Sequence, residues 1–330
     1  MKTLVTGASG FVGSAIVRRL LDVGHNVRAL LRPNSPQDNI KGLDVEITVG
    51  DLTDTATLKQ AATGCSALFH AAADYRLWAP HPQSMYATNV DGTRNIMRAA
   101  LDAGVQRVVY TSSVATLGIH QDGTPADEET PSSLDSMIGH YKRSKFMAET
   151  LVHELIEKED LPAVIVNPST PVGPRDIKPT PTGKMILDAA RGRMPAYVDT
   201  GLNIAHVDDV AAGHLLALEK GVIGERYILG GENMSLKDIL SQVATIAGRK
   251  PPRIRLPHNA VLPMAWVAQE IARLSGTAQP IMTVDGVRMA KKRMFYSSAK
   301  AEHALGYAHR AAVDALRDAV EWFRSHDYCS

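Results

Sequence analysis

The sequence contains little cysteine, few aromatic residues and almost no excess of charge. Its 330 residues include only Cys65 and Cys329, and aromatic side chains make up 5% of the chain. So little cysteine, without a recognisable signal sequence, indicates a reducing, cytoplasmic setting. The formal net charge of +1 argues against nucleic acid as the main partner. No spacing of the histidines resembles a metal site.

Apolar sequence, by contrast, is plentiful and free of repeats. Hydrophobic residues make up 45% of the chain, which is enough to bury a large core. No internal repeat or low-complexity linker interrupts it. This length and composition suit one α/β nucleotide-binding domain with a smaller substrate-binding lobe.

A glycine-rich turn near the N-terminus joins an apolar run to a helical pattern. Lys2–Thr6 is typical of a buried parallel strand, and Phe11–Val23 carries apolar residues at helical spacing. Glycines between them would let the backbone approach a pyrophosphate, and the helix N-terminus would supply free N–H groups. A chance glycine triplet in a turn is the alternative. The residues expected to bind the cofactor here are Gly7, Gly10, Phe11, Val12 and Gly13.

The next two expected strands end in residues that bear on the choice of cofactor. Asn26–Leu31 is followed by Arg32, and in dinucleotide folds an arginine near this point accommodates the 2′-phosphate of NADP, whereas a carboxylate binds the ribose of NAD. NADP is therefore favoured, unless Arg32 is only a solvated side chain at a strand end. After Val45–Val49, Asp51 and Leu52 would contact the adenine amino group and ring, although an ordinary turn would explain them nearly as well.

Small residues and then large amphipathic ones follow the fourth expected strand, which ends at His70. Alanines directly after a strand let the backbone pass close to a bound cofactor, although they can equally mark simple close packing. Loops at the carboxyl ends of strands bind the ligands of doubly wound folds, so we expect substrate contacts from the loop that comes next. The alanines are Ala71, Ala72 and Ala73, and the loop residues are Tyr75, Arg76 and Trp78.

Three later residues have the types and spacing of a hydride-transfer site. The fifth expected strand, Val108–Thr111, leads to Ser112 and Ser113, whose hydroxyls could polarise a carbonyl. Tyr141 and Lys145 are four residues apart on an expected helix and therefore share a face. A tyrosine with a pKa of about 10 is a poor acid–base catalyst near neutrality, and an adjacent ammonium lowers that pKa. A surface Tyr–Lys pair on an amphipathic helix is the alternative.

Together these segments resemble the extended short-chain dehydrogenase/reductase family. The resemblance implies an α/β Rossmann fold, a doubly wound parallel sheet with a smaller, mainly helical C-terminal substrate lobe. It also implies that Ser113, rather than Ser112, is catalytic, and that the backbone of Asn167, Pro168 and Ser169 contacts the nicotinamide. The matching segments are Thr6–Gly13, Asp51-Leu52, His70–Ala73, Asn89–Asn95, Tyr110–Gly118, Tyr141 to Lys145 and His206–Val210.

Two stretches resemble one branch of that family more narrowly. Residues 72–80 and 167–183 are similar to the hopanoid-associated branch, often labelled sugar epimerase, whose neighbours are dihydroflavonol reductases and hydroxysteroid dehydrogenases. Nucleotide-sugar epimerases of the family usually hold NAD with an acidic residue where this chain has Arg32. Its 4,6-dehydratases carry Thr-Asp-Glu where this chain has Ser-Val-Ala at 113–115, which argues against dehydration. A 3,5-epimerase would need a cysteine that neither Cys65 nor Cys329 is placed to supply.

The expected domain organisation follows the density of proline and glycine, which rises after residue 167. We expect an NADP-binding Rossmann domain over residues 1–167, to which residues 206–230 return with a helix and a strand, Arg226–Leu229. Residues 168–205 and 231–310 would form the mainly helical substrate lobe, and residues 311–330 a closing helix.

One helix in the expected lobe, Ala260–Leu274, is unusually apolar but too short to span a bilayer. A core-facing helix is one interpretation. A surface that contacts a membrane or grips a bulky apolar ligand is the other. The basic runs at 249–255 and 290–293 are interpreted as solvated faces. The histidines His70, His140 and His206 are interpreted as structural.

The sequence therefore predicts an NADPH-dependent reductase in which Tyr141 protonates a carbonyl oxygen and Lys145 tunes it. The expected substrate is a small molecule or an amphiphilic, hopanoid-linked sugar or polyol, held by Tyr75, Arg76, Trp78 and, after the sixth strand, Arg175 with Lys178. A nucleotide-sugar epimerase is the second hypothesis, and a non-enzymatic NADP-sensing or scaffold protein is the third. Two further contacts are considered. One is peripheral contact with a membrane, and the other is a homodimer formed through the Tyr141 helix and residues 82–103.

Overall fold

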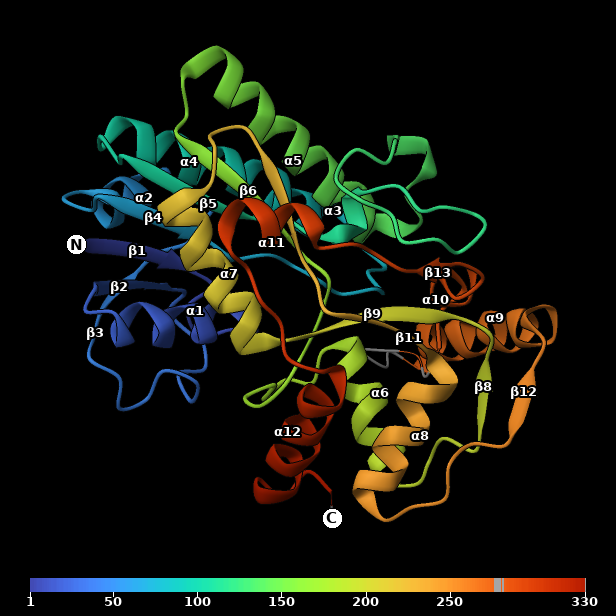
Figure 1. Cartoon of the computed structure of the whole chain (residues 1–330). Helices are drawn as coiled ribbons and strands as arrows, with labels where there is room; N and C mark the ends of the chain where they lie inside the picture. Colours follow the sequence, from blue (N-terminus) through green and yellow to red (C-terminus); the bar gives the residue numbers. More distant parts are fainter. Residues whose placement is uncertain (276–279, 281, 330) are drawn as a thin grey trace.

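A seven-stranded parallel sheet dominates the computed structural model, which describes residues 1–275, 280 and 282–329 (Figure 1). Residues 276–279 and 281 of the expected lobe, and residue 330 of the expected closing helix, lie outside the described residues. The order across the sheet is β10-β6-β5-β4-β1-β2-β3. From β1 the chain adds strands first toward one edge, through β2 and β3, and then toward the other, from β4 onward, so the strand order reverses between β1 and β4. The strands are β1 (Lys2–Thr6), β2 (Asn26–Leu31), β3 (Val45–Val49), β4 (Ala67–His70), β5 (Arg107–Thr111), β6 (Ala163–Pro168) and β10 (Arg226–Leu229).

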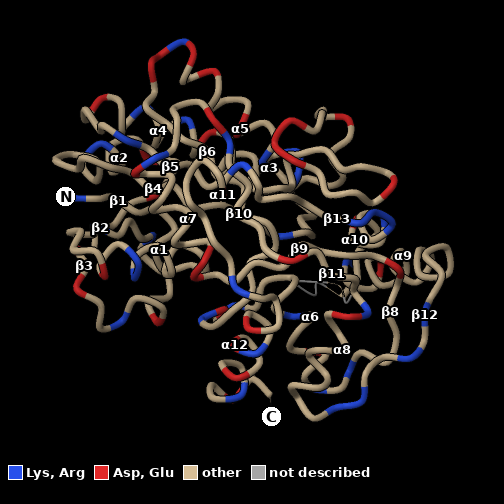
Figure 2. Tube along the Cα trace, in the orientation of Figure 1, with Lys and Arg blue, Asp and Glu red and all other residues tan. Residues whose placement is uncertain are grey.

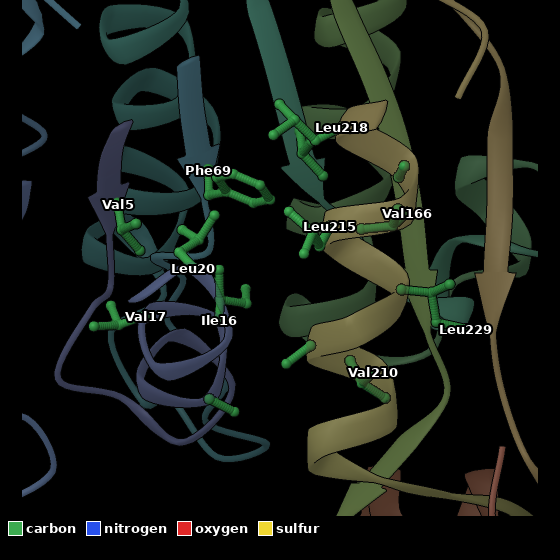
Figure 3. Packing of buried hydrophobic residues seen from close by; sticks show 14 of the residues in the cluster. Val5, Ile16, Val17, Leu20, Phe69, Val166, Val210, Leu215, Leu218 and Leu229 are labelled. Carbon is green, nitrogen blue, oxygen red and sulfur yellow. The ribbon is translucent and has the colours of Figure 1, made fainter. Parts of the chain in front are cut away.

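Helices cover both faces of this sheet, which explains why its central strands are apolar along their whole length. Every residue of β4 and β6 is buried. On one face α1 and α7 pack against each other and against the sheet, as Figure 3 shows for Ile16, Leu20 and Leu215. The helices of that face are α1 (Phe11–Asp22), α7 (Val207–Lys220) and α11 (Ala299–Leu305), and those of the other are α2 (Thr55–Ala62), α4 (Gly92–Asp102) and α5 (Gly139–Glu159).

The second part of the molecule is a smaller lobe with its own apolar core. The helices α6 (Pro181–Ala190), α8 (Leu236–Ala247) and α12 (Ala312–Ser325) share that core. Beside it lie α9 (His258–Ser275) and α10 (Val284–Met289). The short strands of the lobe are β7 (Thr170–Val172), β8 (Ala196–Val198), β9 (Gly201–His206), β11 (Glu232–Ser235), β12 (Ile254–Leu256) and β13 (Arg293–Met294).

The lobe is less purely helical than the sequence predicts. β9 is the centre of its larger sheet, because β7, β11 and β13 all pair with it. β8 and β12 form a separate two-stranded sheet. Strands of two to six residues show too little of the two-residue alternation to be recognised in the sequence.

Two buried polar residues join the lobe to the nucleotide domain. The Asn203 side chain donates to the carbonyls of Gly231 and Tyr296 and accepts from the Gly231 amide, so it ties β9 to the chain leaving β10. His206 accepts from the Asp208 amide at the start of α7, and its other ring nitrogen lies 3.0 Å from the Asp318 carboxylate on α12. The structural role expected for His206 is confirmed by these contacts.

Candidate active site

The residues expected in the active site meet at the carboxyl-terminal edge of the sheet. The glycine-rich turn follows β1, Ala71 follows β4, Ser113 follows β5, and Ser169 follows β6. β1 lies between β2 and β4, so this edge includes the point where the strand order reverses. In open α/β sheets that point is where ligands bind.

The glycine-rich turn is built so that no side chain intervenes between it and its neighbours. Gly7 has a positive φ of 69°, and a Cβ added there would lie 2.7 Å from the backbone nitrogen of Ala72. A Cβ on Gly13 would lie 2.0 Å from the Gly7 carbonyl oxygen. The N-cap of α1 is Gly10, which has no side chain to occupy the free N–H groups of the first turn. The turn therefore leaves a positive helix terminus open to an anion.

The end of β4 is fixed by a buried histidine. The His70 ring nitrogens lie 2.7 Å from the Thr6 hydroxyl and 3.0 Å from the Thr93 hydroxyl. Thr6 in turn accepts from the Ala72 amide, so the alanine backbone is held against the glycine-rich turn. Burial, together with the charge of Lys145, lowers the pKa of His70 to about 3, so this histidine is neutral and structural. That outcome agrees with its expected structural role.

Ser113 and Tyr141 are brought together from β5 and α5. Ser113 is the N-cap of the short helix η2 (Val114–Thr116), and its hydroxyl accepts from the Ala115 amide. Burial raises the pKa of Tyr141, and a hydrogen bond with the Ser113 side chain opposes part of that rise. Ser112 is nearly fully buried. Ser113 is thus the serine whose side chain contacts the tyrosine.

Lys145 supplies a buried cation one helical turn after Tyr141 in α5. The sequence predicts that this ammonium lowers the pKa of Tyr141, but burial raises that pKa and only the Ser113 hydrogen bond opposes the rise. Only 3% of the residue is exposed, and its ammonium donates to the Tyr110 hydroxyl at 3.1 Å and to the Thr111 carbonyl at 2.9 Å. The same nitrogen lies 4.7 Å from the centre of the Tyr110 ring, which stacks on His70. Burial lowers the pKa of Lys145 to about 8, and the carboxylate of Glu149 opposes the shift.

Glu149 is a site residue that the sequence analysis does not single out. It lies one helical turn beyond Lys145 in α5 and is buried. Its carboxylate accepts from the Asn167 amide at 2.9 Å, the Thr116 hydroxyl at 3.0 Å and the Arg226 guanidinium at 3.2 Å. The Asn167 amide also donates to the Ser113 carbonyl. The spacing of four from Lys145 is the one signal in the sequence that could have drawn attention to Glu149.

Asn89 is a second such residue, although it lies inside one of the matching segments. It occupies a one-turn π-helix, Ala87–Asp91, between α3 (Gln83–Tyr86) and α4. Its side chain accepts from the Asp74 amide and donates to the Asp74 carbonyl and the Ser144 hydroxyl, so it fastens the loop after β4 to α5. A π-helical turn inserts one extra residue into a helix, and such turns recur at functional sites.

The residues expected around the adenosine lie where the second and third strands end. Arg32 is exposed, and among the described residues none forms an ion pair with its side chain. Asp51 accepts from the amide and hydroxyl of Thr53, and these bonds, with the charge of Arg32, lower its pKa. Leu52 is buried in the core below α4. The adenine contacts of Asp51 and Leu52 remain predictions.

In the loop after β4, the arginine expected to contact the substrate already has a partner within the protein. The Arg76 guanidinium forms a two-pronged ion pair with Asp74, which removes its free positive charge. The pKa of Tyr75 is raised by partial burial and by the carboxylates of Asp176 and Asp74, which places this loop near residue 176. Trp78 is half-buried.

Arg175 also lies in a different setting from the one expected. Its guanidinium pairs with Asp208 in the first turn of α7. Its carbonyl accepts from the Asn39 side chain, which also donates to the Ser9 carbonyl in the glycine-rich turn. The acidic first turn of α7 attracts the Arg175 side chain, and the residue lies beside the glycine-rich turn. Substrate binding by Arg175 remains a prediction. Lys178 is exposed.

A family model described as the NAD dependent epimerase/dehydratase family matches residues 3–230 of the chain. The chain belongs to that family. The expected membership of the extended short-chain dehydrogenase/reductases, and with it an enzyme on a Rossmann fold, is confirmed.

Individual relatives of this epimerase/dehydratase-family chain align over almost their whole length. A Synechocystis sp. protein with the provisional name dihydroflavonol 4-reductase is 47% identical, covering 98% of this chain and 95% of the relative. The sterol demethylase protein B of Methylococcus capsulatus is 35% identical over 98% of each chain. The crystal structure of gox2253 superposes with a TM-score of 0.90 at 58% identity, covering 99% of each chain.

The residues present fit the nicotinamide cofactor that the family uses. Gly7 and Gly13 let the turn pack closely on Ala72 and on itself, and the N-terminus of α1 has neither an acidic residue nor a side-chain cap. The side-chain amide oxygen of Asn167 is buried at the same edge and has no hydrogen-bond partner among the described residues. A bound dinucleotide would meet the open N–H groups of the turn through its phosphates.

The Glu149 contacts generate a prediction about pH. Lys145 loses its charge as the pH rises through its pKa, and Glu149 keeps that pKa from falling further. We expect Glu149→Gln to move the alkaline decline of turnover to lower pH, measured as a pH profile of kcat/KM. The matched control is Glu154→Gln, an exposed residue of the same helix that pairs with Lys158, and its profile should be unchanged. Lower turnover at every pH with an unmoved profile would make Glu149 a packing residue only.

Proposed function

We propose that the protein is an NADPH-dependent reductase of a carbonyl group on an amphiphilic, sugar- or polyol-bearing substrate that is linked to a hopanoid. The observation that carries the reductase assignment is the hydrogen bond between Ser113 and Tyr141, with the buried Lys145 one helical turn further along α5. Relatives named as a reductase and a sterol demethylase protein support this reaction class and an apolar polycyclic substrate. The proposed setting is the cytoplasm.

The reaction would use three side chains for three tasks. Ser113, positioned by η2, donates a hydrogen bond to the substrate carbonyl oxygen. Tyr141 transfers its phenolic proton to that oxygen as negative charge develops on it. Lys145 stabilises the resulting phenolate and binds the nicotinamide ribose. The reduced nicotinamide, when bound, supplies the hydride.

The protonation states at neutral pH favour this direction. Because the pKa of Tyr141 is raised, its phenol is protonated and available as an acid. Because the pKa of Lys145 is about 8, its ammonium is mostly charged below that pH. Both groups are therefore in the form that carbonyl reduction requires, and both leave it as the pH rises. Oxidation of an alcohol, which needs Tyr141 as a base, would gain from the same rise.

The cofactor preference rests on Arg32. Its exposed guanidinium follows β2 and acts on Asp51 after β3, so it lies at the edge expected to receive the adenosine ribose. A free arginine there would bind the 2′-phosphate of NADP through charge-assisted hydrogen bonds. A carboxylate at the position of Arg32 would instead favour NAD.

This assignment predicts that NADPH binds at least about tenfold more tightly than NADH, or about 1.4 kcal/mol. Arg32→Asp should invert the preference, because it replaces a phosphate ligand with a group that repels phosphate. Titration of both cofactors by protein fluorescence or calorimetry measures the ratio. Arg19→Asp, at the far end of α1, changes the net charge equally and should preserve it. Equal affinities in the unmodified protein would overturn the NADP assignment.

The acid–base assignment predicts separable effects of two substitutions. Tyr141→Phe should lower turnover by a factor on the order of a hundred or more, because the proton donor is lost, while cofactor affinity stays nearly unchanged. Lys145→Met should weaken both, because the ammonium serves the tyrosine and the ribose. Steady-state kinetics and cofactor titration on each variant decide this. Full turnover by Tyr141→Phe on the true substrate would exclude Tyr141 as the acid.

The substrate class is inferred from the loop after β4. The Arg76–Asp74 pair presents donors and acceptors with little net charge, which suits hydroxyl groups better than phosphate. Tyr75 is exposed and Trp78 half-buried in the same loop, so both can offer aromatic surface to an apolar body. A polyol attached to an apolar body fits this combination.

A nucleotide-sugar epimerase is the second candidate, and the family description favours it. Such an enzyme removes and returns one hydride, which leaves the cofactor unchanged overall. A protein that only senses NADP or acts as a scaffold is the third, and the intact Ser113, Tyr141 and Lys145 argue against it.

The substrate proposal predicts that a hopanoid-like amphiphile with a polyol head binds more tightly than UDP-sugars. Trp78→Ala should weaken binding of the amphiphile severalfold and leave binding of UDP-sugars unchanged, because only the amphiphile has an apolar body. Both ligands are compared on both proteins in one binding assay, so each ligand controls for the other. Tighter UDP-sugar binding that is unaffected by Trp78→Ala would reject the lipid interpretation and favour the epimerase.

A further inference from the structure

The outward side of α9 is apolar, which is unusual for a surface helix. Its inner side packs on the lobe through Val261, Ala265 and Ala272. Its outer side exposes large apolar residues, and Leu274 is 85% exposed. We call the following set the α9 stripe: Met264, Trp266, Val267, Ile271 and Leu274.

The stripe is continuous along the helix. Met264, Val267, Ile271 and Leu274 follow one another at intervals of three and four residues, so they lie in one row. Trp266, 61% exposed, lies on the flank of that row. Glu270 and Arg273 pair with each other at 3.7 Å beside it. Apolar surface of this extent on a helix marks an interaction site.

Positive charge gathers at the N-terminal end of α9. Figure 2 shows blue segments on β12, next to α9, and around α10 and β13. The Lys291 ammonium lies 3.3 Å from the Asn259 side chain in the first turn of α9. Asp199 pairs with two of the arginines near this end, Arg255 and Arg293. We call the following set of exposed cations the basic rim: Arg255, Lys291, Lys292 and Arg293.

A hollow of about 600 Å³ beside the first turn of α9 adds to this surface. Arg255 and Lys291 line it together with His258 and Asn259, and Asp199 is its acidic residue. Arg255 pairs with Asp199, whereas Lys291 has no carboxylate partner among the described residues. Cationic side chains thus lie at the end of the helix where the hollow opens.

This combination identifies a lipid surface better than a second copy of the chain. A two-fold symmetric contact that covered both the stripe and the basic rim would bring two sets of four cations toward each other, with one carboxylate, Asp199, in each set. An anionic bilayer offers the opposite: acyl chains for the apolar row and lipid phosphates for the basic rim. No helix among the described residues is long and apolar enough to cross a membrane, so the contact would be interfacial.

We propose that α9 and its basic rim dock the protein onto an anionic lipid bilayer, with the α9 stripe at the boundary between headgroups and acyl chains. Two observations carry this: the apolar row is exposed, and four exposed cations lie near the N-terminal end of the helix that bears it. The proposal does not depend on the identity of the substrate or on the acid–base assignment.

The test is co-sedimentation of the full chain with vesicles of phosphatidylcholine containing phosphatidylglycerol, and with vesicles of phosphatidylcholine alone. We expect binding to the anionic vesicles, weakened at high salt, and a blue shift of fluorescence that Trp266→Phe abolishes. The double variant Ile271→Ser/Leu274→Ser should bind at least about tenfold more weakly. The control Val222→Ser/Ile223→Ser, which removes exposed apolar residues after α7, should bind as the unmodified protein does.

Charge is tested separately by Arg255→Glu/Lys291→Glu, which should weaken binding to the anionic vesicles severalfold while circular dichroism stays unchanged. Absence of vesicle binding would overturn the proposal, and so would equal binding to neutral vesicles. If the unmodified protein is instead a dimer that Ile271→Ser/Leu274→Ser dissociates, without vesicle binding, the occupant of the stripe is a second copy. Each of these results leaves the reductase assay unaffected, so the two proposals fail independently.

Discussion

The burial of one ammonium group is the constraint on which the site depends. Lys145 is removed from water and is held by the Tyr110 hydroxyl and the Thr111 carbonyl, and no carboxylate in the described part of the chain forms an ion pair with its nitrogen. Burial without direct pairing lowers its pKa to about 8 and makes its charge available to whatever else enters the site.

A buried polar network joins the ends of four strands at the site, β1, β4, β5 and β6. Tyr110, which receives the ammonium, stacks on His70 at the end of β4, and His70 is held by Thr6 from β1. On the other side Glu149 connects α5 to Asn167 in β6. Because these residues are buried and mutually bonded, a change in one strand end alters the position of the others. The glycine-rich turn is part of the same construction, since Gly7 leaves the room in which the backbone at Ala72 can approach.

Much of this was predictable from the sequence, because it depends on local patterns. The strands from Lys2–Thr6 to Arg226–Leu229 are short apolar runs with clear ends, and the spacing of Tyr141 and Lys145 on one helix fixes their common face. What the sequence could not provide are partners distant in the chain. Arg76 is neutralised by Asp74 and Arg175 by Asp208, and neither pairing follows from composition. The sequence allows two interpretations of the apolar α9, because periodicity identifies an apolar row but does not show whether that row faces the core or the surface.

In the proposed reaction, hydride passes from cofactor to substrate with net consumption of the cofactor. The most direct test incubates the pure protein with NADPH and a set of aldehydes, polyol- or sugar-bearing amphiphiles and nucleotide sugars, and follows nicotinamide absorbance and product together. We expect one mole of NADPH to be oxidised for each mole of alcohol formed from an amphiphile. Conversion of a nucleotide sugar to its epimer with the nicotinamide absorbance unchanged would contradict it.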